Sequence, residues 1–129
     1  MKEYPFSKNL SDTGYCVFPK ELEDDELTFF HATPAENVPA ILKEGFKADP
    51  EKSSGLWSVS FAKRSVSAFD HAMRRRGSEA IDFVILAVRY ENLDQPHITQ
   101  NSGDIHDYCL DPAPQIIGYV KVPASYRHV

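Results

Sequence analysis

The chain has 129 residues, a length typical of one domain with its own hydrophobic core. Hydrophobic residues make up 42% and charged residues 26%, as in ordinary soluble globular proteins. The net charge of −5 disfavours a protein whose affinity depends on neutralising many phosphates, because such proteins usually carry a basic surface. We interpret the one basic run, Arg74, Arg75 and Arg76, as a solvated helix end.

The two cysteines and the N-terminus bear on the cellular compartment. Cys16 and Cys109 are far apart and lack a metal-ligand spacing, which favours a reducing intracellular setting, with a single disulfide as the alternative. The first residues contain no apolar segment of signal-peptide length, and no apolar run approaches the roughly 20 residues that a membrane-spanning helix needs. The sequence therefore predicts a cytoplasmic protein, or one exported without a classical signal.

The first 26 residues are polar and include an acidic run from Glu21 to Glu26. We expect an N-terminal arm over residues 1–26, with one short strand at residues 15–18, followed by a single domain over residues 27–129. The apolar residues 27–30 predict a strand that ends on His31.

A helix is expected after this strand. Asn37 is a good N-cap, Pro39 falls in the first turn, where its missing N–H costs nothing, and Gly45 is placed to end the helix. A start at Thr33, with Glu36 completing a capping box, is the alternative, but it would place Pro39 deeper in the helix. We therefore favour a short turn before Asn37. The apolar face expected for this helix consists of Val38, Ile41 and Leu42.

Residues 48–55 resemble a loop, and the alternating stretch L-W-S-V-S-F-A, residues 56–62, predicts a strand. Its two faces are Leu56, Ser58 and Ser60 on one side and Trp57, Val59 and Phe61 on the other. A second helix is expected to follow and to stop at Gly77. Its apolar positions are Val66, Phe69 and Met73.

The long apolar stretch at residues 81–90 predicts a central strand buried on both faces. Residues 91–106 are polar and are expected to form a loop, and two further strands are expected at residues 107–110 and 115–122. The predicted fold is α+β, with a mixed, mostly antiparallel sheet and two or more short helices, because several connections are too short for parallel crossovers.

Four polar residues stand where predicted strands end or expose a polar face: His31, Ser58, Ser60 and Asp107. Each has a structural interpretation, as a strand-end histidine, as solvent-facing serines and as a turn aspartate. Their order along the chain changes this interpretation, because three motifs occur together.

The three motifs resemble those of the ADP-ribosyltransferase superfamily over residues 27–122. F-F-H-A-T is similar to the opening aromatic strand and His-Gly-Thr motif, with Ala32 in the glycine position. V-S-F-A-K-R-S-V-S-A-F, residues 59–69, resembles the second motif, with Ser60 in the tyrosine position. H-D-Y-C-L-D-P-A-P-Q-I, residues 106–116, resembles the closing motif of poly-ADP-ribose polymerases, with Asp107 in the catalytic glutamate position. The chain is also similar to the small rifampicin-modifying ADP-ribosyltransferases.

This resemblance implies an ADP-ribosyltransferase-like fold with a split sheet and an NAD site. His31, Ser60 and Asp107 would be catalytic, since a carboxylate stabilises the oxocarbenium-like transition state when the nicotinamide–ribose bond breaks. The residues expected to bind NAD, the co-substrate, are His31, Ala32, Thr33, Ser58, Ser60 and Phe61, with Phe61 as a stacking surface for nicotinamide. Asp94 is a competing acidic residue, placed where the rifampicin-type enzymes carry theirs, and Gln115 is a third candidate.

The leading hypothesis is a mono-ADP-ribosyltransferase that acts on a protein, nucleic acid or small-molecule acceptor. Two alternatives remain: a non-catalytic module that binds NAD or ADP-ribose, and an interaction protein without a nucleotide site. The small size suits a toxin, effector or resistance enzyme by analogy. The five histidines have no HxH or HExxH spacing, so no metal site is expected, and no membrane partner is expected.

Overall fold

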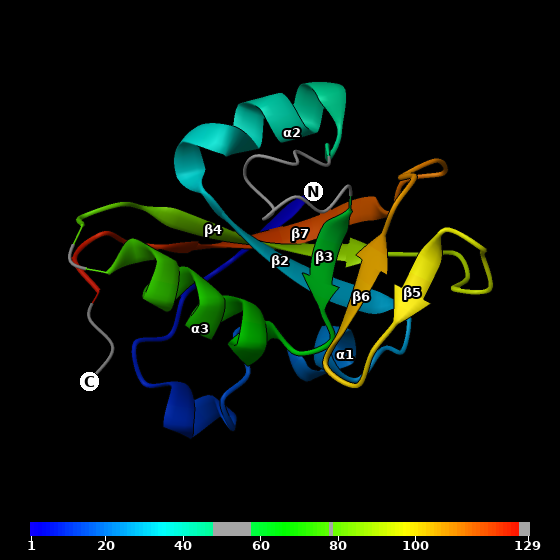
Figure 1. Ribbon diagram of the computed structural model, residues 1–129. Coiled ribbons are helices and arrows are strands. Elements are labelled where there is room, and N and C mark those ends of the chain that lie inside the picture. The colour runs from blue at the N-terminus through cyan, green and yellow to red at the C-terminus, as the bar shows by residue number, and fades with distance from the viewer. Residues whose placement is uncertain (48–57, 78, 127–129) are drawn as a thin grey trace.

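A computed structural model describes residues 1–47, 58–77 and 79–126. Seven strands form one mixed sheet in the order β1-β7-β4-β2-β3-β6-β5 (Figure 1). Of the described strand pairs, β1 with β7 is parallel and the others are antiparallel, which confirms the predicted α+β class and mostly antiparallel sheet. The strands are β1 (Lys2–Tyr4), β2 (Thr28–Pro34), β3 (Val59–Ala62), β4 (Phe83–Arg89), β5 (Ile98–Gln100), β6 (Asp104–Asp107) and β7 (Gln115–Val122).

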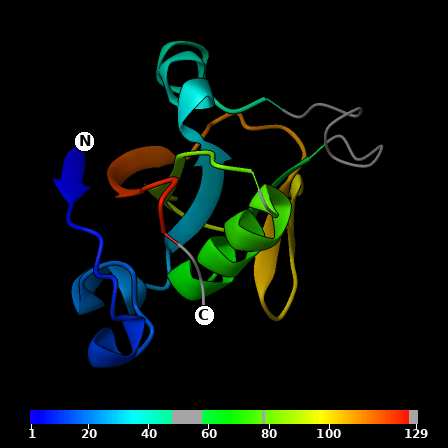
Figure 2. The same cartoon turned by 90° about the vertical axis from the view of Figure 1, so that its left-hand side faces the viewer.

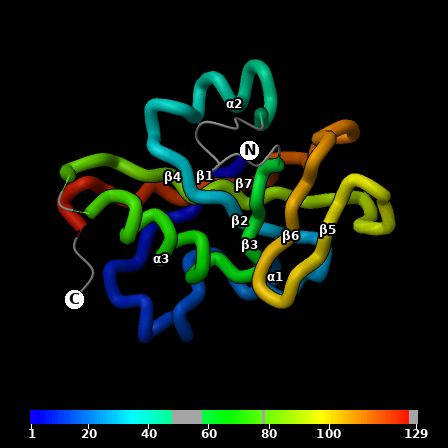
Figure 3. Tube along the Cα trace, in the orientation of Figure 1, coloured from blue at the N-terminus to red at the C-terminus, as the bar shows by residue number. Residues whose placement is uncertain are grey.

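Two helices lie on opposite sides of the strands, as Figures 1 and 3 show. They are α2 (Val38–Glu44) and α3 (Ser65–Arg76); the remaining helical turns are η1 (Leu10–Thr13), α1 (Lys20–Glu23) and η2 (Ala35–Asn37). The central strand β4 is buried from Phe83 to Val88, as predicted. Its side chains alternate between a core under α3 and the N-terminal segment, and a second core under α2. Because both faces of β4 are buried, apolar side chains are needed at successive positions, which explains its continuous apolar sequence.

Strand β2 does not end on His31, so the strand end predicted there is wrong. The strand continues to Pro34 because it pairs with β4 along its whole length, and His31 lies in mid-strand opposite Leu86. The pairing of a long, regular neighbour therefore holds Ala32, Thr33 and Pro34 extended, although their own sequence suggests a turn.

The sheet is almost divided between β2 and β3. These strands are joined by a single pair, Phe30 with Ala62, whereas β3 pairs with β6 over four residues. Strands β3, β6 and β5 accordingly lie at an angle to β2, β4 and β7 in Figure 1. The backbone of β2 and β3 diverges beyond Phe30, and this opening positions the candidate site.

The N-terminal segment is part of the packed structure. The strand expected at residues 15–18 is absent from this described region, and β1 joins the sheet edge instead. Val17 and Phe18 are buried in the core under α3, and the Val17 N–H donates to the buried Ser65 hydroxyl over 2.9 Å. The Ser65 hydroxyl in turn donates to Glu23. In Figure 2 the N-terminal helices (blue) lie in the same half of the molecule as α3, away from α2.

Both main helices form where expected, but their buried faces differ from the prediction. Asn37 is the last residue of the short turn η2 and directly precedes α2, and Gly45 ends the helix at φ +83°, a conformation that favours glycine. Leu42 is 51% exposed, so it does not belong to the apolar face. The buried residues of α3 are Ser65, Ala68, Phe69, Ala72 and Arg76, so Val66 does not belong to its buried face.

The C-terminal strands differ from the prediction in one respect that matters for the site. Strand β7 covers residues 115–122 as expected, but β6 runs from Asp104 to Asp107, so Asp107 ends a strand rather than beginning one. The polar region expected to be a loop also contains β5. The predicted loop at residues 48–55, with Leu56 and Trp57, lies outside the described residues.

Candidate functional site

His31 lies where β2 and β3 separate. Its Nδ1 is 2.9 Å from the Ser60 carbonyl oxygen. A carbonyl oxygen can only accept, so Nδ1 carries the proton and donates it, and in the neutral ring Nε2 is left as an acceptor. The side chain thus binds a β3 backbone group that the diverging strands leave without a partner from β2.

The environment of His31 keeps the ring neutral. Burial lowers the pKa of His31 below its ordinary value, and the hydrogen bond to the Ser60 carbonyl opposes this change only in part. The neighbouring basic side chains His71 and Arg75 lower the pKa of His31 further. Although the residue is only half-buried, its ring packs between Phe46 and Phe61, with centroids 5.3 and 5.5 Å away.

Two hollows meet at His31. The first has a volume of about 600 Å³ and is lined by parts of β2, α2, β3, α3 and β6; the second, of about 510 Å³, extends toward the turn between β5 and β6. Both are of the size that holds a small organic ligand. We call them together the His31 cleft. The residues that line both are His31, Ala32, Ser60, His71 and Arg75.

Most of the residues expected to bind NAD are brought together in this cleft. Ala32 and Ser60 line both hollows, and Thr33 and Ser58 line the first. Phe61 does not line either hollow, because it is fully buried beneath His31 and packs against Phe46. The stacking surface expected from Phe61 is therefore not available at the cleft. Phe46 packs against the His31 ring and provides an aromatic side chain in the lining of the first hollow.

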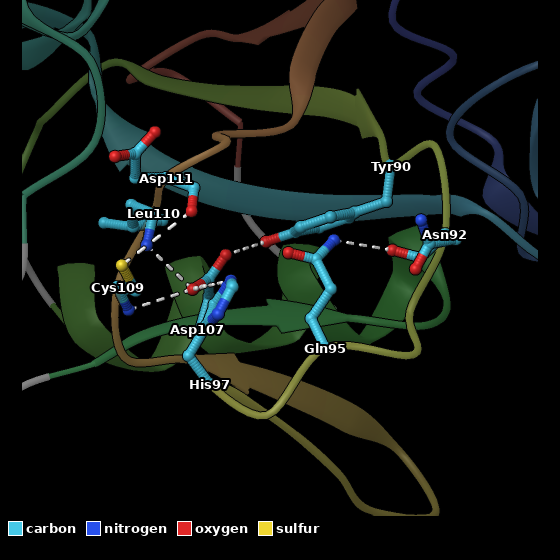
Figure 4. Close-up of polar contacts among 8 residues, drawn as sticks. All are labelled: Tyr90, Asn92, Gln95, His97, Asp107, Cys109, Leu110 and Asp111. Carbon is cyan, nitrogen blue, oxygen red and sulfur yellow. Dashed lines mark hydrogen bonds and ion pairs between the residues drawn. The ribbon is translucent and has the colours of Figure 1, made fainter.

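Asp107 is fully buried and its carboxylate is engaged (Figure 4). One oxygen accepts the Tyr90 hydroxyl over 2.8 Å, and the other accepts the backbone N–H groups of Cys109 and Leu110 over 3.0 and 2.8 Å. Burial, followed by the hydrogen bond to Asp107, raises the pKa of Tyr90, so the phenol keeps the proton that it donates. His97 Nε2 is 3.8 Å from the carboxylate, beyond hydrogen-bond distance.

The position of Asp107 separates it from His31 and Ser60. Side chains alternate along a strand, so Asp107 shares the core-facing side of β6 with Ile105, while Asp104 and His106 share the other. Asp107 lines neither hollow of the His31 cleft. Its carboxylate holds the turn after β6, including Leu110 at φ +60°, which is an uncommon conformation for leucine.

Asp104 places a carboxylate in the lining of the second hollow, beside Ser60. It accepts the Ser60 hydroxyl over 3.2 Å and the Asn101 side-chain amide over 2.9 Å. His106 Nε2 is 3.5 Å from the same carboxylate, and His106 Nδ1 is 3.1 Å from the Ser58 hydroxyl. Sequence reasoning missed this role because β6 was expected to begin three residues later. With the strand placed at residues 104–107, the register with β3 pairs Ser60 with His106, and alternation along β6 directs Asp104 to the same side as His106.

The two alternative acidic or amide candidates lie elsewhere. Asp94 is exposed in the turn after β4, where its backbone N–H binds the Asn92 side chain. Gln115 is exposed at the start of β7, opposite Arg89. Neither lines the His31 cleft.

The described part of the chain contains no group of three or more histidine, cysteine or acidic side chains arranged to hold a metal ion. Cys16 and Cys109 are both free thiols. Of the helices in the described ranges, none combines the length and apolarity needed to cross a bilayer.

Comparison with known proteins adds no further constraint: the chain matches no protein-family model, no curated protein and no solved structure.

Proposed function

We propose that this protein is an NAD-dependent mono-ADP-ribosyltransferase with an ADP-ribosyltransferase-like fold. The observation that carries the proposal is the His31 cleft, where a neutral histidine, Ser60 and the Asp104 carboxylate meet at the opening between β2 and β3. The motifs around His31 and Ser60 resemble the superfamily, and both motifs line this one cleft.

His31 would bind the ribose next to nicotinamide. Its Nδ1–H is occupied by the Ser60 carbonyl, so the free Nε2 can accept a hydrogen bond from a ribose hydroxyl. A neutral ring suits this position, because a positively charged imidazolium would repel the charge that develops on the sugar. Ala32 and Thr33 continue β2 into the first hollow beside it, where the nicotinamide amide would lie against the strand.

Asp104 takes the catalytic role that the sequence suggested for Asp107. As the bond between the ribose carbon and the nicotinamide nitrogen breaks, its electron pair returns to the pyridinium ring and neutral nicotinamide leaves. The Asp104 carboxylate stabilises the positive charge that remains on the ribose. The acceptor nucleophile then attacks the same carbon and gives its proton to the carboxylate.

A binding module without transfer is the second candidate. The observation that favours it is the engagement of Asp104 by Ser60 and Asn101, which donate hydrogen bonds to both oxygens of the carboxylate. Ser60 also offers no aromatic ring where the superfamily usually has tyrosine, so the nicotinamide would be held less firmly.

Nicotinamide release from NAD, followed by transfer of labelled ADP-ribose to proteins and nucleic acids of a cell extract, tests the proposal. Asp104→Asn should lower the rate at least about a hundredfold, as expected when a catalytic carboxylate is removed. Asp107→Asn is the matched control, because it removes a carboxylate outside the cleft and should retain most of the activity.

Three other results have distinct meanings. Binding of NAD without release would identify the non-catalytic module. Loss of activity in Asp107→Asn but not in Asp104→Asn would contradict the assignment of the carboxylate. Absence of both binding and release at millimolar NAD would contradict the proposed function.

A further inference from the structure

The three consecutive arginines at the end of α3 occupy three different environments. Arg76 is buried, and its guanidinium donates to the backbone carbonyls of Pro123 and Ala124 over 3.2 and 3.4 Å. Arg74 and Arg75 are exposed, but only Arg75 lines the His31 cleft. The interpretation of this run as a solvated helix end is therefore wrong for Arg76 and incomplete for Arg75.

Arg75 shares the cleft with a second basic side chain of the same helix. His71 lies one turn earlier, at the spacing that places two side chains on one helix face, and it lines both hollows as Arg75 does. Helix α3 packs on β2 and β3, which supply His31 and Ser60. The effect of both side chains on the pKa of His31 agrees with this proximity.

Among the described residues of the cleft, none forms an ion pair with Arg75. Among the other charged residues of the lining, Lys47 forms an ion pair with Glu44 over 3.2 Å, and Asp104 binds Ser60 and Asn101. Arg75 forms no hydrogen bond or ion pair with any residue of the ranges 1–47, 58–77 and 79–126. A guanidinium that no described residue engages, in a concave and partly apolar site, is complementary to an anionic ligand.

We propose that Arg75, assisted by His71, binds a diphosphate group of the ligand in the His31 cleft. This inference rests on the proposed function for the identity of the ligand as a dinucleotide. The planar guanidinium can donate two parallel hydrogen bonds to phosphate oxygens, and such charge-assisted bonds are shorter and stronger than neutral ones. The position of Arg75 at the junction of the two hollows places the diphosphate beside the ribose that His31 binds.

The two neighbouring arginines supply a matched pair of variants. Arg75→Gln and Arg74→Gln remove one charge each from adjacent exposed positions of α3, but only the first alters the cleft. Isothermal titration of both variants with NAD and with ADP-ribose measures the difference, and thermal unfolding confirms that both remain folded. Arg75→Gln should weaken both ligands about tenfold or more, the loss of one charge-assisted hydrogen bond, while Arg74→Gln should change them less than twofold.

A third variant separates hydrogen-bond geometry from charge. Arg75→Lys keeps the charge but loses the planar pair of donors, so its affinity should fall between those of the wild type and Arg75→Gln. Added salt should weaken binding to the wild type more than binding to Arg75→Gln, because the diphosphate contact is electrostatic.

The inference and the proposed function can fail separately. If NAD binds and Arg75→Gln binds it as tightly as Arg74→Gln does, the diphosphate site is overturned and the proposed function stands. If ADP-ribose binds through Arg75 but NAD releases no nicotinamide, the site stands and transfer is overturned. If neither ligand binds the wild type, both are overturned.

Discussion

The hydrogen bond between His31 and the Ser60 carbonyl fixes which nitrogen of the ring is free. The strands β2 and β3 separate beside His31, and this opening leaves the Ser60 carbonyl oxygen available to accept the hydrogen bond from the ring. The position of the proton on Nδ1 follows from this one contact, and the acceptor role of Nε2 follows in turn. The chemistry assigned to His31 therefore depends on the local divergence of two strands.

The lowered pKa of His31 has a consequence for stability against pH. Above its ordinary pKa of about 6.5 the histidine is neutral in both the folded and the unfolded chain and contributes nothing to the pH dependence. As the pH falls below that value, the unfolded chain binds a proton that the folded protein does not, so the free energy of unfolding decreases.

We therefore expect the free energy of unfolding to fall more between pH 7.5 and pH 5.5 in the wild type than in His31→Gln. Chemical denaturation of both proteins at each pH measures the difference. Equal acid sensitivity of the two proteins would show that the folded protein does not hold His31 neutral.

Asp107 is expected to act on stability rather than on the reaction. Asp107→Ala leaves the Tyr90 hydroxyl and the N–H groups of Cys109 and Leu110 without an acceptor, which should cost about 3 kcal/mol or more of unfolding free energy. Asp107→Asn keeps an acceptor oxygen of the same shape and should cost about 1 kcal/mol. Denaturant unfolding compares the two variants, and a loss below about 1 kcal/mol in Asp107→Ala would argue against this role.

At the scale of the elements, the parallel contact between β1 and β7 depends on a glycine. A Cβ atom at Gly118 would lie 2.7 Å from the Tyr4 ring and 3.1 Å from the Lys2 carbonyl oxygen. Tyr4 can shift, but the Lys2 carbonyl belongs to the backbone of β1, directly opposite Gly118. Only glycine therefore allows β1 to approach β7 closely.

Gly118→Ala should displace β1 and lower the unfolding free energy by about 1–3 kcal/mol, while leaving the central strands in place. Hydrogen exchange should accelerate at residues 2–4 but not at residues 84–88. Gly103→Ala is the control, because a Cβ atom there meets no atom within 4 Å. Unchanged exchange at residues 2–4 in Gly118→Ala would contradict the packing of β1 on β7.

The elements that the sequence predicts best are those whose own pattern determines them. The buried run of β4, the strand β7 and the helix α3 with its glycine stop needed no information from the rest of the chain. The end of β2 could not be predicted, because pairing with β4 overrides the turn tendency of Ala32, Thr33 and Pro34. The burial of Arg76 could not be predicted from the local sequence either, because its hydrogen-bond partners lie almost fifty residues away along the chain.

The candidate site was also predictable only in part, because some of its residues lie in local motifs and others depend on strand pairing. His31, Ala32, Thr33, Ser58 and Ser60 were found from motifs, and the fold brings them to one cleft. The identity of the carboxylate in the cleft depended on the residue at which β6 begins. The polar residues before Asp104 have no pattern that predicts a strand. Pairing with β3 sets that start, so the choice between Asp104 and Asp107 required the sheet register.

At the scale of the whole molecule, the protein carries a net charge of −5 but places Arg75, which pairs with no described acidic residue, in the His31 cleft. The negative net charge therefore does not exclude an anionic ligand, because the local electrostatic potential in a cleft can differ in sign from the net charge. The cleft lies where the sheet is almost divided, and its lining includes the neutral His31 and the basic residues His71 and Arg75 of α3. The guanidinium of Arg75 and the free Nε2 of His31 are complementary to an anionic ligand with a hydroxyl group, as the proposed function requires.

Titration of NAD into the wild type and His31→Ala tests this account most directly. We predict saturable binding of one NAD to the wild type and an affinity at least about tenfold lower in His31→Ala, from loss of the contact to the ribose. Thermal unfolding serves as the control for folding of the variant. Failure of the folded wild type to bind NAD at millimolar concentration, or full NAD affinity in His31→Ala, would contradict the role assigned to the His31 cleft.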